Sequence, residues 1–431
     1  MRPLFTRRFF VCLAALICAG GAAAPGSEGS LDAGEMTKID LEGLSVQLGK
    51  PIQVCAYPAW QEGPQGRWAF NHPVPAIARF PGGELLVTYS LVADYNDNPR
   101  NVSGLQFSTD GGKTWGARHD FLAEHQPMIF VPDGQNALIA IPAYLFKRSA
   151  TDERNFQANY TRLEKGGKRV IIEPQAVSVL DWPWPVGTLY GFGFFGKDSV
   201  KGISPESSWV TLCFDGSALW VKGNLLATAY GIKKGETKSR NVVMTSVDRG
   251  RTWRYLSSIA DATGLPERSE GPTETAMVQL ENGDLMAVFR IGSGKEMNLR
   301  RSYSKDAGRT WSQAEAIPPY SVEPSLLRTK NGTLALSTGR PGIGLWLSRD
   351  PMGKAWQEVD IVQHHNRWAP DATYRIAEYE PGRWQTSAYT EMVEVAPNHL
   401  LLVYDRGAKP KPSGPGDLTR IFVLPIEIQR H

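Results

Sequence analysis

One eight-residue pattern occurs three times in the 431-residue chain and limits its fold more than any other feature. The copies at 108–115, 246–253 and 304–311 all read S-x-D-x-G-x-T-W, and a fourth, degenerate copy spans 348–356. Their serines lie 138, 58 and 44 residues apart (108 to 246, 246 to 304 and 304 to 348). Self-similarity of this kind is typical of folds that repeat one supersecondary unit several times.

The pattern itself predicts a tight hairpin. The serine and aspartate side chains can bond turn amides, the glycine takes the left-handed conformation, and the tryptophan packs where the next strand begins. Strand-like runs precede the copies, as at 104–107 and 241–244, and glycine-bounded strands lie further upstream at 82–87, 283–288 and 332–336. We therefore expect an all-β fold built from repeated hairpins.

The composition agrees with many short strands and excludes several other classes of protein. The 43 glycines, 30 prolines and 43 aromatic residues (13 Trp, 14 Tyr and 16 Phe) suit tight turns between short strands. With 42% hydrophobic and 21% charged residues, the chain can bury a sizeable core, which argues against long disorder. No period of three or seven residues appears, so collagen and coiled coil are excluded.

The first 24 residues have the order of a secretory signal. Three arginines and no acidic residue are followed by an apolar run at 9–19 and by small residues at 20–24. The apolar run is too short to span a bilayer, so we predict a signal peptide cleaved near Ala24 and a periplasmic or secreted protein. Arg7 and Arg8 also resemble a twin-arginine signal, which leaves both export routes open.

Removing this leader changes the charge and the cysteine count. The 47 Lys and Arg residues fall by three to 44, which equals the 44 Asp and Glu residues, so no nucleic-acid partner is indicated. Only Cys55 and Cys213 remain, either as a disulfide or as buried free thiols. No CxxC or HExxH sequence occurs, so neither a metal nor an organic cofactor is expected.

From about residue 50 to its end, the chain resembles the Asp-box (bacterial neuraminidase repeat) proteins and, among them, the sialidase superfamily of six-bladed β-propellers. The resemblance rests on the four repeats quoted above. It implies a six-bladed propeller at 51–431, which follows the predicted signal peptide at 1–24 and an N-terminal leader segment at 25–50. The long gap between the first two repeats leaves room for a blade or two without the pattern.

The resemblance also implies a catalytic set. The family's acid/base aspartate lies about eleven residues before the first repeat serine, where this chain has Asp97, with Asp94 as a possible substitute and an Asx turn as the structural alternative. The family's tyrosine nucleophile matches Tyr389, which could otherwise be a core aromatic. A phenol titrates near pH ~10 and needs a neighbouring base, which the resemblance places at Glu274, ahead of the rival Glu323.

A neutral nucleophile suits an acidic substrate, because a carboxylate on the anomeric carbon would repel a carboxylate nucleophile. The resemblance assigns Arg290 and Arg340 to binding that acidic group. The first of the family's three arginines is missing, because Pro73 stands at its position. A charge-assisted contact contributes about 1.5–3 kcal/mol, so the loss of one arginine would weaken the binding of a carboxylate by a factor of about ten to a hundred or more. The missing arginine therefore bears on the substrate more than on the reaction.

Four residues could replace the missing arginine, namely Arg67, His72, Arg79 and Arg100. A 2-keto acid sugar, a uronic acid and a neutral sugar all remain open as substrates. The pair of histidines at 364 and 365 is expected on a surface loop, since adjacent strand residues point to opposite faces and would not share a metal.

Three functions follow from these residues. The leading one is a secreted exo-glycosidase resembling exo-α-sialidase, which removes terminal sialic acid or a related acidic sugar from glycans with retention. The second is the same propeller acting on another acidic glycan. The third is a non-catalytic Asp-box propeller that binds glycans. None of them needs a cofactor, a nucleic acid or a membrane span in the mature chain.

Overall fold

In the computed structural model the chain divides into two units, Met1–Glu35 and Met36–His431. The structure describes only residues of the second unit, in the ranges 36–62, 68–70, 73–91, 102–122, 129–134, 136–147, 156–164, 175–187, 210–294, 296–340, 342–377, 386–407 and 418–431. The predicted signal peptide, residues 1–24, therefore lies outside the described residues.

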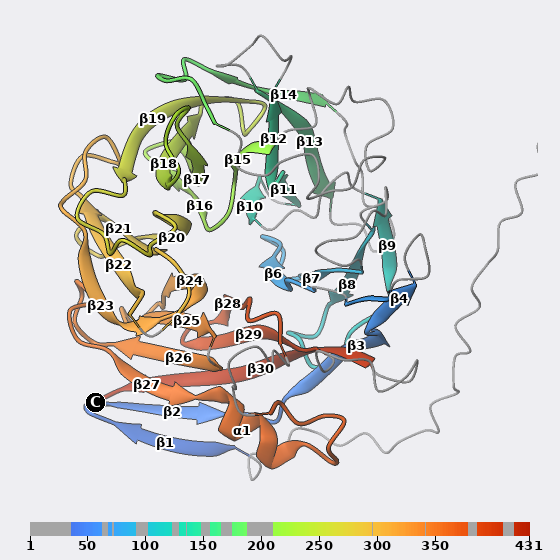
Figure 1. Cartoon of the computed structure of the whole chain (residues 1–431). Coiled ribbons are helices and arrows are strands. Elements are labelled where there is room, and N and C mark those ends of the chain that lie inside the picture. The colour runs from blue at the N-terminus through green and yellow to red at the C-terminus, as the bar shows by residue number, and fades with distance from the viewer. Residues whose placement is uncertain are drawn as a thin grey trace, which may run out of the picture. The chain divides into compact units, whose positions relative to one another are not determined.

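Six blades of mainly antiparallel strands form a β-propeller, which confirms the predicted fold (Figure 1). The first blade contains β6 (Ala76–Arg79), β7 (Leu85–Ser90), β8 (Val102–Ser108) and β9 (His119–Leu122). The second contains β10 (Ile129–Asp133), β11 (Ala137–Ile141), β12 (Tyr144–Lys147), β13 (Phe156–Glu164) and β14 (Gln175–Leu180). The third contains β15 (Val210–Cys213), β16 (Ala218–Val221), β17 (Asn224–Ile232), β18 (Ser239–Ser246) and β19 (Thr252–Ala260). The strands of the second and third blades belong to one ten-stranded sheet, because β12 pairs with β15 and β14 pairs with β19.

The remaining blades follow in chain order. The fourth contains β20 (Thr273–Gln279), β21 (Leu285–Arg290), β22 (Asn298–Ser304) and β23 (Glu315–Tyr320). The fifth contains β24 (Val322–Arg328), β25 (Leu334–Gly339), β26 (Ile343–Ser348) and β27 (Gln357–Asp360), and helix α1 (Ile361–Trp368) follows it. The sixth combines β28 (Glu391–Ala396), β29 (His399–Arg406) and β30 (Leu418–Arg430) with β1 (Thr37–Leu41), β2 (Leu44–Leu48) and β3 (Ile52–Pro58), while β4 (Trp60–Glu62) and β5 (Trp68–Phe70) form a separate hairpin.

The two ends of the propeller chain meet in the sixth blade. Both β2 and β3 pair antiparallel with β30, with Leu48 opposite Ile426 and Ile52 opposite Val423. The sheet of this blade therefore begins at Thr37, within the segment 25–50 that the sequence analysis set apart from the propeller. The second strands of the fourth and fifth blades, β21 and β25, are buried along almost their whole length between their neighbours.

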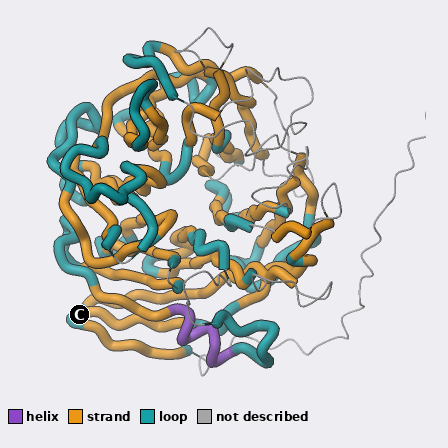
Figure 2. Tube along the Cα trace, in the orientation of Figure 1, coloured by secondary structure: helices purple, strands orange, loops and turns teal. Residues whose placement is uncertain are grey.

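Helix α1 is the one helix among the described residues, and Figure 2 shows it beside the strands of the fifth and sixth blades. It carries His364 and His365, so their assignment to a surface loop is wrong. Both imidazoles are buried: His364 Nε2 lies 2.8 Å from the carbonyl oxygen of Gly49, and His365 Nδ1 lies 2.8 Å from the hydroxyl of Tyr404. Burial lowers the pKa of both histidines, which suits neutral packing residues.

Two further expectations concern the thiols and the membrane. Cys55 and Cys213 are both free, and Cys213 is buried, so the alternative without a disulfide holds. Within the ranges that the structure describes, no helix combines the length and the apolar character needed to cross a bilayer.

The repeated pattern forms the hairpins that join β8 to β9 in the first blade, β18 to β19 in the third and β22 to β23 in the fourth. In each copy the serine Oγ accepts a hydrogen bond from the shared glycine amide at 2.8–2.9 Å. In each, an aspartate oxygen accepts the shared threonine amide at 2.8–3.0 Å. These glycines have φ of 82–90°, the left-handed conformation that the sequence predicts. The pattern is therefore a structural device that closes a blade edge.

We expect Asp248→Ala to lower the free energy of unfolding by about 2 kcal/mol, because Asp248 accepts bonds from the Thr252 amide and hydroxyl and from the Ser246 hydroxyl. Burial alone would raise the pKa of Asp248, but these hydrogen bonds lower it below its usual value. The difference in free energy of unfolding between wild type and Asp248→Ala is thus complete above about pH 4 and decreases as the pH falls below that. Urea denaturation at several pH values measures it.

Asp350→Ala is the matched control in the degenerate fourth copy. Its carboxylate accepts one hydrogen bond among the described residues, from the Met352 amide, so we expect a loss of about 1 kcal/mol or less. Equal losses in the two variants, or a loss in Asp248→Ala that persists at pH 2, would contradict this account of the hairpin.

Candidate active site

An unusual backbone conformation recurs where the inner strands of the blades begin. Val74, Glu274, Glu323 and Ala388 have positive φ values of 40°, 33°, 40° and 69°. A positive φ is uncommon for residues other than glycine and persists only where the surrounding structure holds it. The registers of β20 and β24 shift at Glu274 and Glu323, so both residues lie at bulges of inner strands.

Glu274 is held by three donors. Its Oε1 accepts hydrogen bonds from Arg290 Nη1 at 2.6 Å and from the Tyr389 hydroxyl at 3.1 Å. Its Oε2 accepts the backbone amide of Glu323 at 2.8 Å. The carboxylate is 4% exposed, so these bonds fix both its position and its orientation. The structure thus brings the predicted base, the predicted nucleophile and one predicted arginine into direct contact.

The segment that carries Tyr389 is anchored from behind by Asp405 near the end of β29. Both carboxylate oxygens of Asp405 accept the Ser387 amide, at 2.9 and 2.8 Å, and the hydroxyls of Ser387 and Thr386 bond Asp405 as well. Burial raises the pKa of Asp405 to about 6, although the bonds from Ser387 lower it. Asp405 therefore positions the tyrosine and does not face the reacting groups itself.

The phenol of Tyr389 is a neutral group in this environment. Burial raises its pKa well above the ordinary value, Glu274, Asp215 and Glu323 raise it further, and Arg290 lowers it. The hydroxyl already donates its hydrogen to Glu274 Oε1. The proton can therefore pass to Glu274 as the phenol oxygen attacks, whereas a free phenolate is disfavoured.

Arg290 ends β21 and shares its guanidinium among several groups. Besides Glu274, it donates from Nη2 to Glu270 at 3.0 Å and to the Ser293 hydroxyl at 2.9 Å. Burial would lower the pKa of Arg290, but Glu274, Tyr389 and Glu270 raise it above its usual value, so it stays charged. Arg290 thus orients Glu274 and carries the positive charge beside it.

Arg340 immediately follows β25 and has φ 41°. Its neighbour Gly339 packs against the tyrosine segment so closely that a Cβ there would lie 1.8 Å from the carbonyl oxygen of Ala388. Arg290 is the last residue of β21 and Arg340 directly follows β25. The two arginines thus lie at corresponding ends of the second strands of adjacent blades. Pro73 is buried at the entry to β6, where the family's first arginine would stand, and its carbonyl accepts the Ser90 amide at 2.7 Å.

Of the four candidates to replace that arginine, the structure describes Arg79. Arg79 is exposed and donates to the carbonyl of Glu394 in the sixth blade. Arg67, His72 and Arg100 lie outside the described residues, as do Asp94 and Asp97. The acid/base assignment to Asp97 therefore stays a prediction.

Two more carboxyl groups join Glu274. One oxygen from each of Asp215, Glu274 and Glu323 lies within 4.8 Å of the others, and all three residues are buried. Glu323 was considered as a rival base, whereas Asp215 was missed. The only sequence signal for Asp215 is the Asp-Gly dipeptide at 215–216, and this dipeptide also occurs in ordinary turns. Here a Cβ at Gly216 would lie 1.8 Å from the Thr275 carbonyl oxygen, so only glycine permits this approach.

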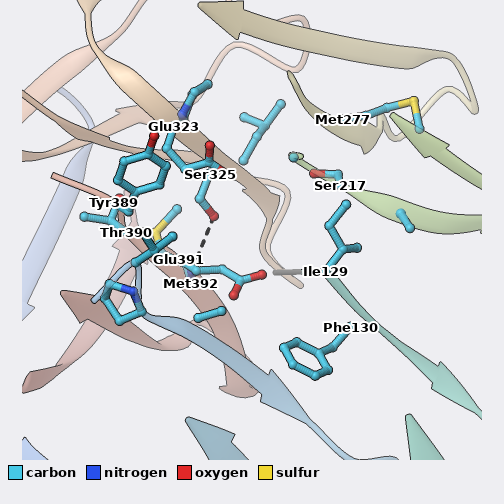
Figure 3. Close-up of a pocket in the computed structure, with 17 residues that line it drawn as sticks. Ile129, Phe130, Ser217, Met277, Glu323, Ser325, Tyr389, Thr390, Glu391 and Met392 are labelled. Carbon is cyan, nitrogen blue, oxygen red and sulfur yellow. Dashed lines mark hydrogen bonds between the residues drawn. The ribbon is translucent and has the colours of Figure 1, made fainter. Parts of the chain in front are cut away.

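A hollow of about 150 Å³ adjoins this cluster at the inner strands (Figure 3). Glu323, Ser325, Tyr389 and Glu391 line it together with residues of the first, second and third blades. Glu391 Oε2 accepts the Ile77 amide at 2.8 Å, and burial raises the pKa of Glu391 to about 8. The lining is thus polar and includes a carboxyl group that is neutral near pH 7.

Comparison with known proteins agrees with this architecture. A BNR repeat-like domain model matches residues 206–399. A sialidase of Micromonospora viridifaciens is 25% identical over 372 residues, which cover 78% of this chain and 54% of the sialidase, so the chain spans about half of that relative.

Two solved structures have a similar fold. A Dyadobacter fermentans protein of unknown function has a TM-score of 0.58 at 16% identity and is covered over its whole length, with 90% of this chain. A Penicillium chrysogenum α-L-arabinanase complexed with arabinobiose has a TM-score of 0.53 at 15% identity, with 87% of this chain and 98% of the arabinanase covered. At these identities the likeness concerns the fold alone.

Proposed function

The chain belongs to the sialidase superfamily of BNR-repeat β-propellers, and we propose that it is a retaining exo-glycosidase with Tyr389 as nucleophile. The observation that carries the proposal is the 3.1 Å hydrogen bond from the Tyr389 hydroxyl to Glu274, whose other partners are Arg290 and the Glu323 amide. A nucleophile bonded to a base that a third group orients is the usual arrangement for covalent catalysis.

In the proposed first step, the Tyr389 oxygen attacks the anomeric carbon while its proton moves to Glu274 Oε1. The glycosidic bond breaks, and the leaving oxygen takes a proton from an acid, for which Asp97 is our candidate. A water molecule, deprotonated by that same residue, then attacks the anomeric carbon and releases Tyr389, which regains its proton from Glu274. Two displacements at one carbon retain its configuration.

We propose a terminal acidic sugar, with sialic acid first, as the substrate. Arg290 and Arg340 supply the cationic groups, and a neutral phenol is compatible with a carboxylate on the anomeric carbon. We further propose that the protein acts outside the cytoplasm, because residues 1–24 resemble a secretory signal.

A second candidate is a neutral sugar, and specific observations favour it. Pro73 removes one guanidinium, and Arg290 already contacts two carboxylates, those of Glu274 and Glu270. Asp215 and Glu323 add acidic groups that would oppose a substrate carboxylate. The arabinanase of similar fold was solved with arabinobiose, so arabinofuranosides belong in any substrate panel.

Arg340→Gln separates these two substrates. For an acidic glycoside we expect the variant to raise KM about tenfold to a hundredfold, because it loses a charge-assisted contact, with a much smaller effect on a neutral glycoside. The measurement is initial rates on an α-sialoside, a uronide and an arabinofuranoside. Arg79→Gln, at an exposed position away from the site, is the matched control and should behave as wild type.

The outcomes distinguish the hypotheses. Turnover of neutral glycosides alone, with no selective effect of Arg340→Gln, would reject the acidic substrate. Folded wild-type protein that binds glycans but releases no sugar from any of them would leave the non-catalytic propeller as the remaining function.

A further inference from the structure

The buried carboxyl groups of Asp215 and Glu323 have no part in the proposed reaction. They come from the third and fifth blades and meet beside Glu274 of the fourth. Asp215 is 4% exposed and Glu323 is 9% exposed, so water contributes little to stabilising a charge on either.

Neither group forms an ion pair with a cation of the described chain, although the charge of Arg290 lowers the pKa of Asp215. Arg290 is the nearby guanidinium, and its bonds go to Glu274, Glu270 and Ser293. Asp215 Oδ1 and Glu323 Oε2 are both buried without a donor among the described residues. Two buried carboxylates with neither a cation nor a donor would be costly, because each would leave an uncompensated charge.

One carboxyl oxygen of each side chain nevertheless lies within 4.8 Å of the other, and a hydrogen bond between the two contributes to the shifts of both pKa values. Ionised carboxylates only accept hydrogen bonds, so a bond between them requires a proton on one. Burial and Glu274 raise the pKa of Asp215 to about 7, while burial and Asp215 raise that of Glu323 well above its usual range. Such a pair titrates as a unit, with one proton held far more tightly than the other.

We propose that Asp215 and Glu323 share one proton at neutral pH and form a singly charged, hydrogen-bonded pair that positions Glu274. The Glu323 amide already binds Glu274 Oε2, so the pair and the proposed base are mechanically joined. The other titratable groups facing the pair are Arg290, Tyr389, Glu391 and the Cys213 thiol. Its effect on catalysis rests on the proposed function, whereas the shared proton does not.

Glu323→Gln tests the proton directly, because glutamine keeps the shape and the charge of a protonated glutamate. Infrared difference spectra of wild type minus variant at pH 7 should show a carboxylic acid C=O band. Glu391 and Asp405 occur in both proteins and cancel. Glu281→Gln, at an exposed position, is the matched control and should show no such band.

Stability supplies a second, independent measurement. A carboxyl whose pKa is raised by folding binds more protons in the native state, so its contribution to stability is lost as pH rises above about 4. Glu323→Gln removes this pH-dependent loss of stability. The melting temperature of the variant minus that of wild type should therefore increase by about 2 °C or more from pH 5 to pH 8. The Glu281→Gln difference should stay flat.

The proposal is overturned if the infrared difference shows no carboxylic acid band at pH 7 and the melting-temperature difference does not change with pH. If Glu323→Gln fails to fold, Asp215→Asn is used instead. In that variant the carboxylic acid band of Glu323 should persist but shift, because its hydrogen-bond partner has changed. An unshifted band would contradict the proposed pair. In an active enzyme, Glu323→Gln should also move the alkaline limb of kcat/KM to higher pH. Lack of turnover in wild type would reject the glycosidase without affecting the spectra.

Discussion

Tyr389→Phe is expected to lower kcat by about 10³-fold or more on any glycoside that the wild type cleaves, with little change in KM. Phenylalanine keeps the ring that lines the hollow and removes only the hydroxyl that would attack the anomeric carbon. Because Asp405 anchors the segment through Ser387 and Thr386, the backbone should keep its position. Steady-state kinetics on the best substrate of the panel measures the effect.

A covalent glycosyl adduct provides the companion measurement. Intact mass spectrometry of acid-quenched wild type should show the adduct during turnover, and Tyr389→Phe should show none. Tyr57→Phe is a suitable control, because the hydroxyl of this buried tyrosine donates to the Ser90 carbonyl and not to Glu274. Normal turnover by Tyr389→Phe would reject the tyrosine mechanism outright.

Glu274→Gln should lower kcat by about 10²–10⁴-fold, the usual range for a lost general base. The single carbonyl oxygen of glutamine can still accept from Tyr389 and Arg290, whereas its amide nitrogen cannot accept from the Glu323 amide. Two of the three hydrogen bonds should therefore survive. Glutamine cannot, however, take up the phenolic proton as the bond to the sugar forms. The variant therefore separates proton transfer from positioning.

Glu270→Gln is the matched control for this variant. Glu270 contacts the same guanidinium, through Nη2 of Arg290, but it is half exposed and does not touch Tyr389. We expect less than a fivefold change in kcat, since an exposed ion pair contributes at most about 1 kcal/mol. Equal losses in Glu270→Gln and Glu274→Gln would show that both act only by holding Arg290 and that Glu274 is no base.

The relation of sequence to fold is clearest in the repeated hairpins. Their hydrogen bonds run within four residues of the serine or the aspartate, so one short segment contains the whole device, and its repetition predicts the propeller. Closure of the ring is different, because β2 pairs with β30 across nearly the whole chain. No local pattern in 25–50 indicates that pairing.

Helix α1 was missed for a related reason. The eight-residue helix begins directly after β27, and the Asp360 side chain caps its start by accepting a hydrogen bond from the Gln363 amide. In so short a helix, one capping residue is a weak sequence signal. The helix is stabilised by burial, with His365 bonded to Tyr404 in another blade. Tertiary packing, which the sequence analysis did not contain, decides such a short helix.

Within the site, the resemblance to the family singles out Glu274, Arg290 and Tyr389, and the local hairpin of β20 and β21 brings Thr273 opposite Arg290. The contact of Tyr389 with Glu274, 115 residues apart, exists only in the folded protein. The same holds for Asp215 and Glu323, which join them from two further blades. Local hydrogen bonds can be read from neighbouring residues. A cluster of buried charges exists only where distant strands converge, and its chemistry depends on burial and mutual repulsion that appear when the ring closes.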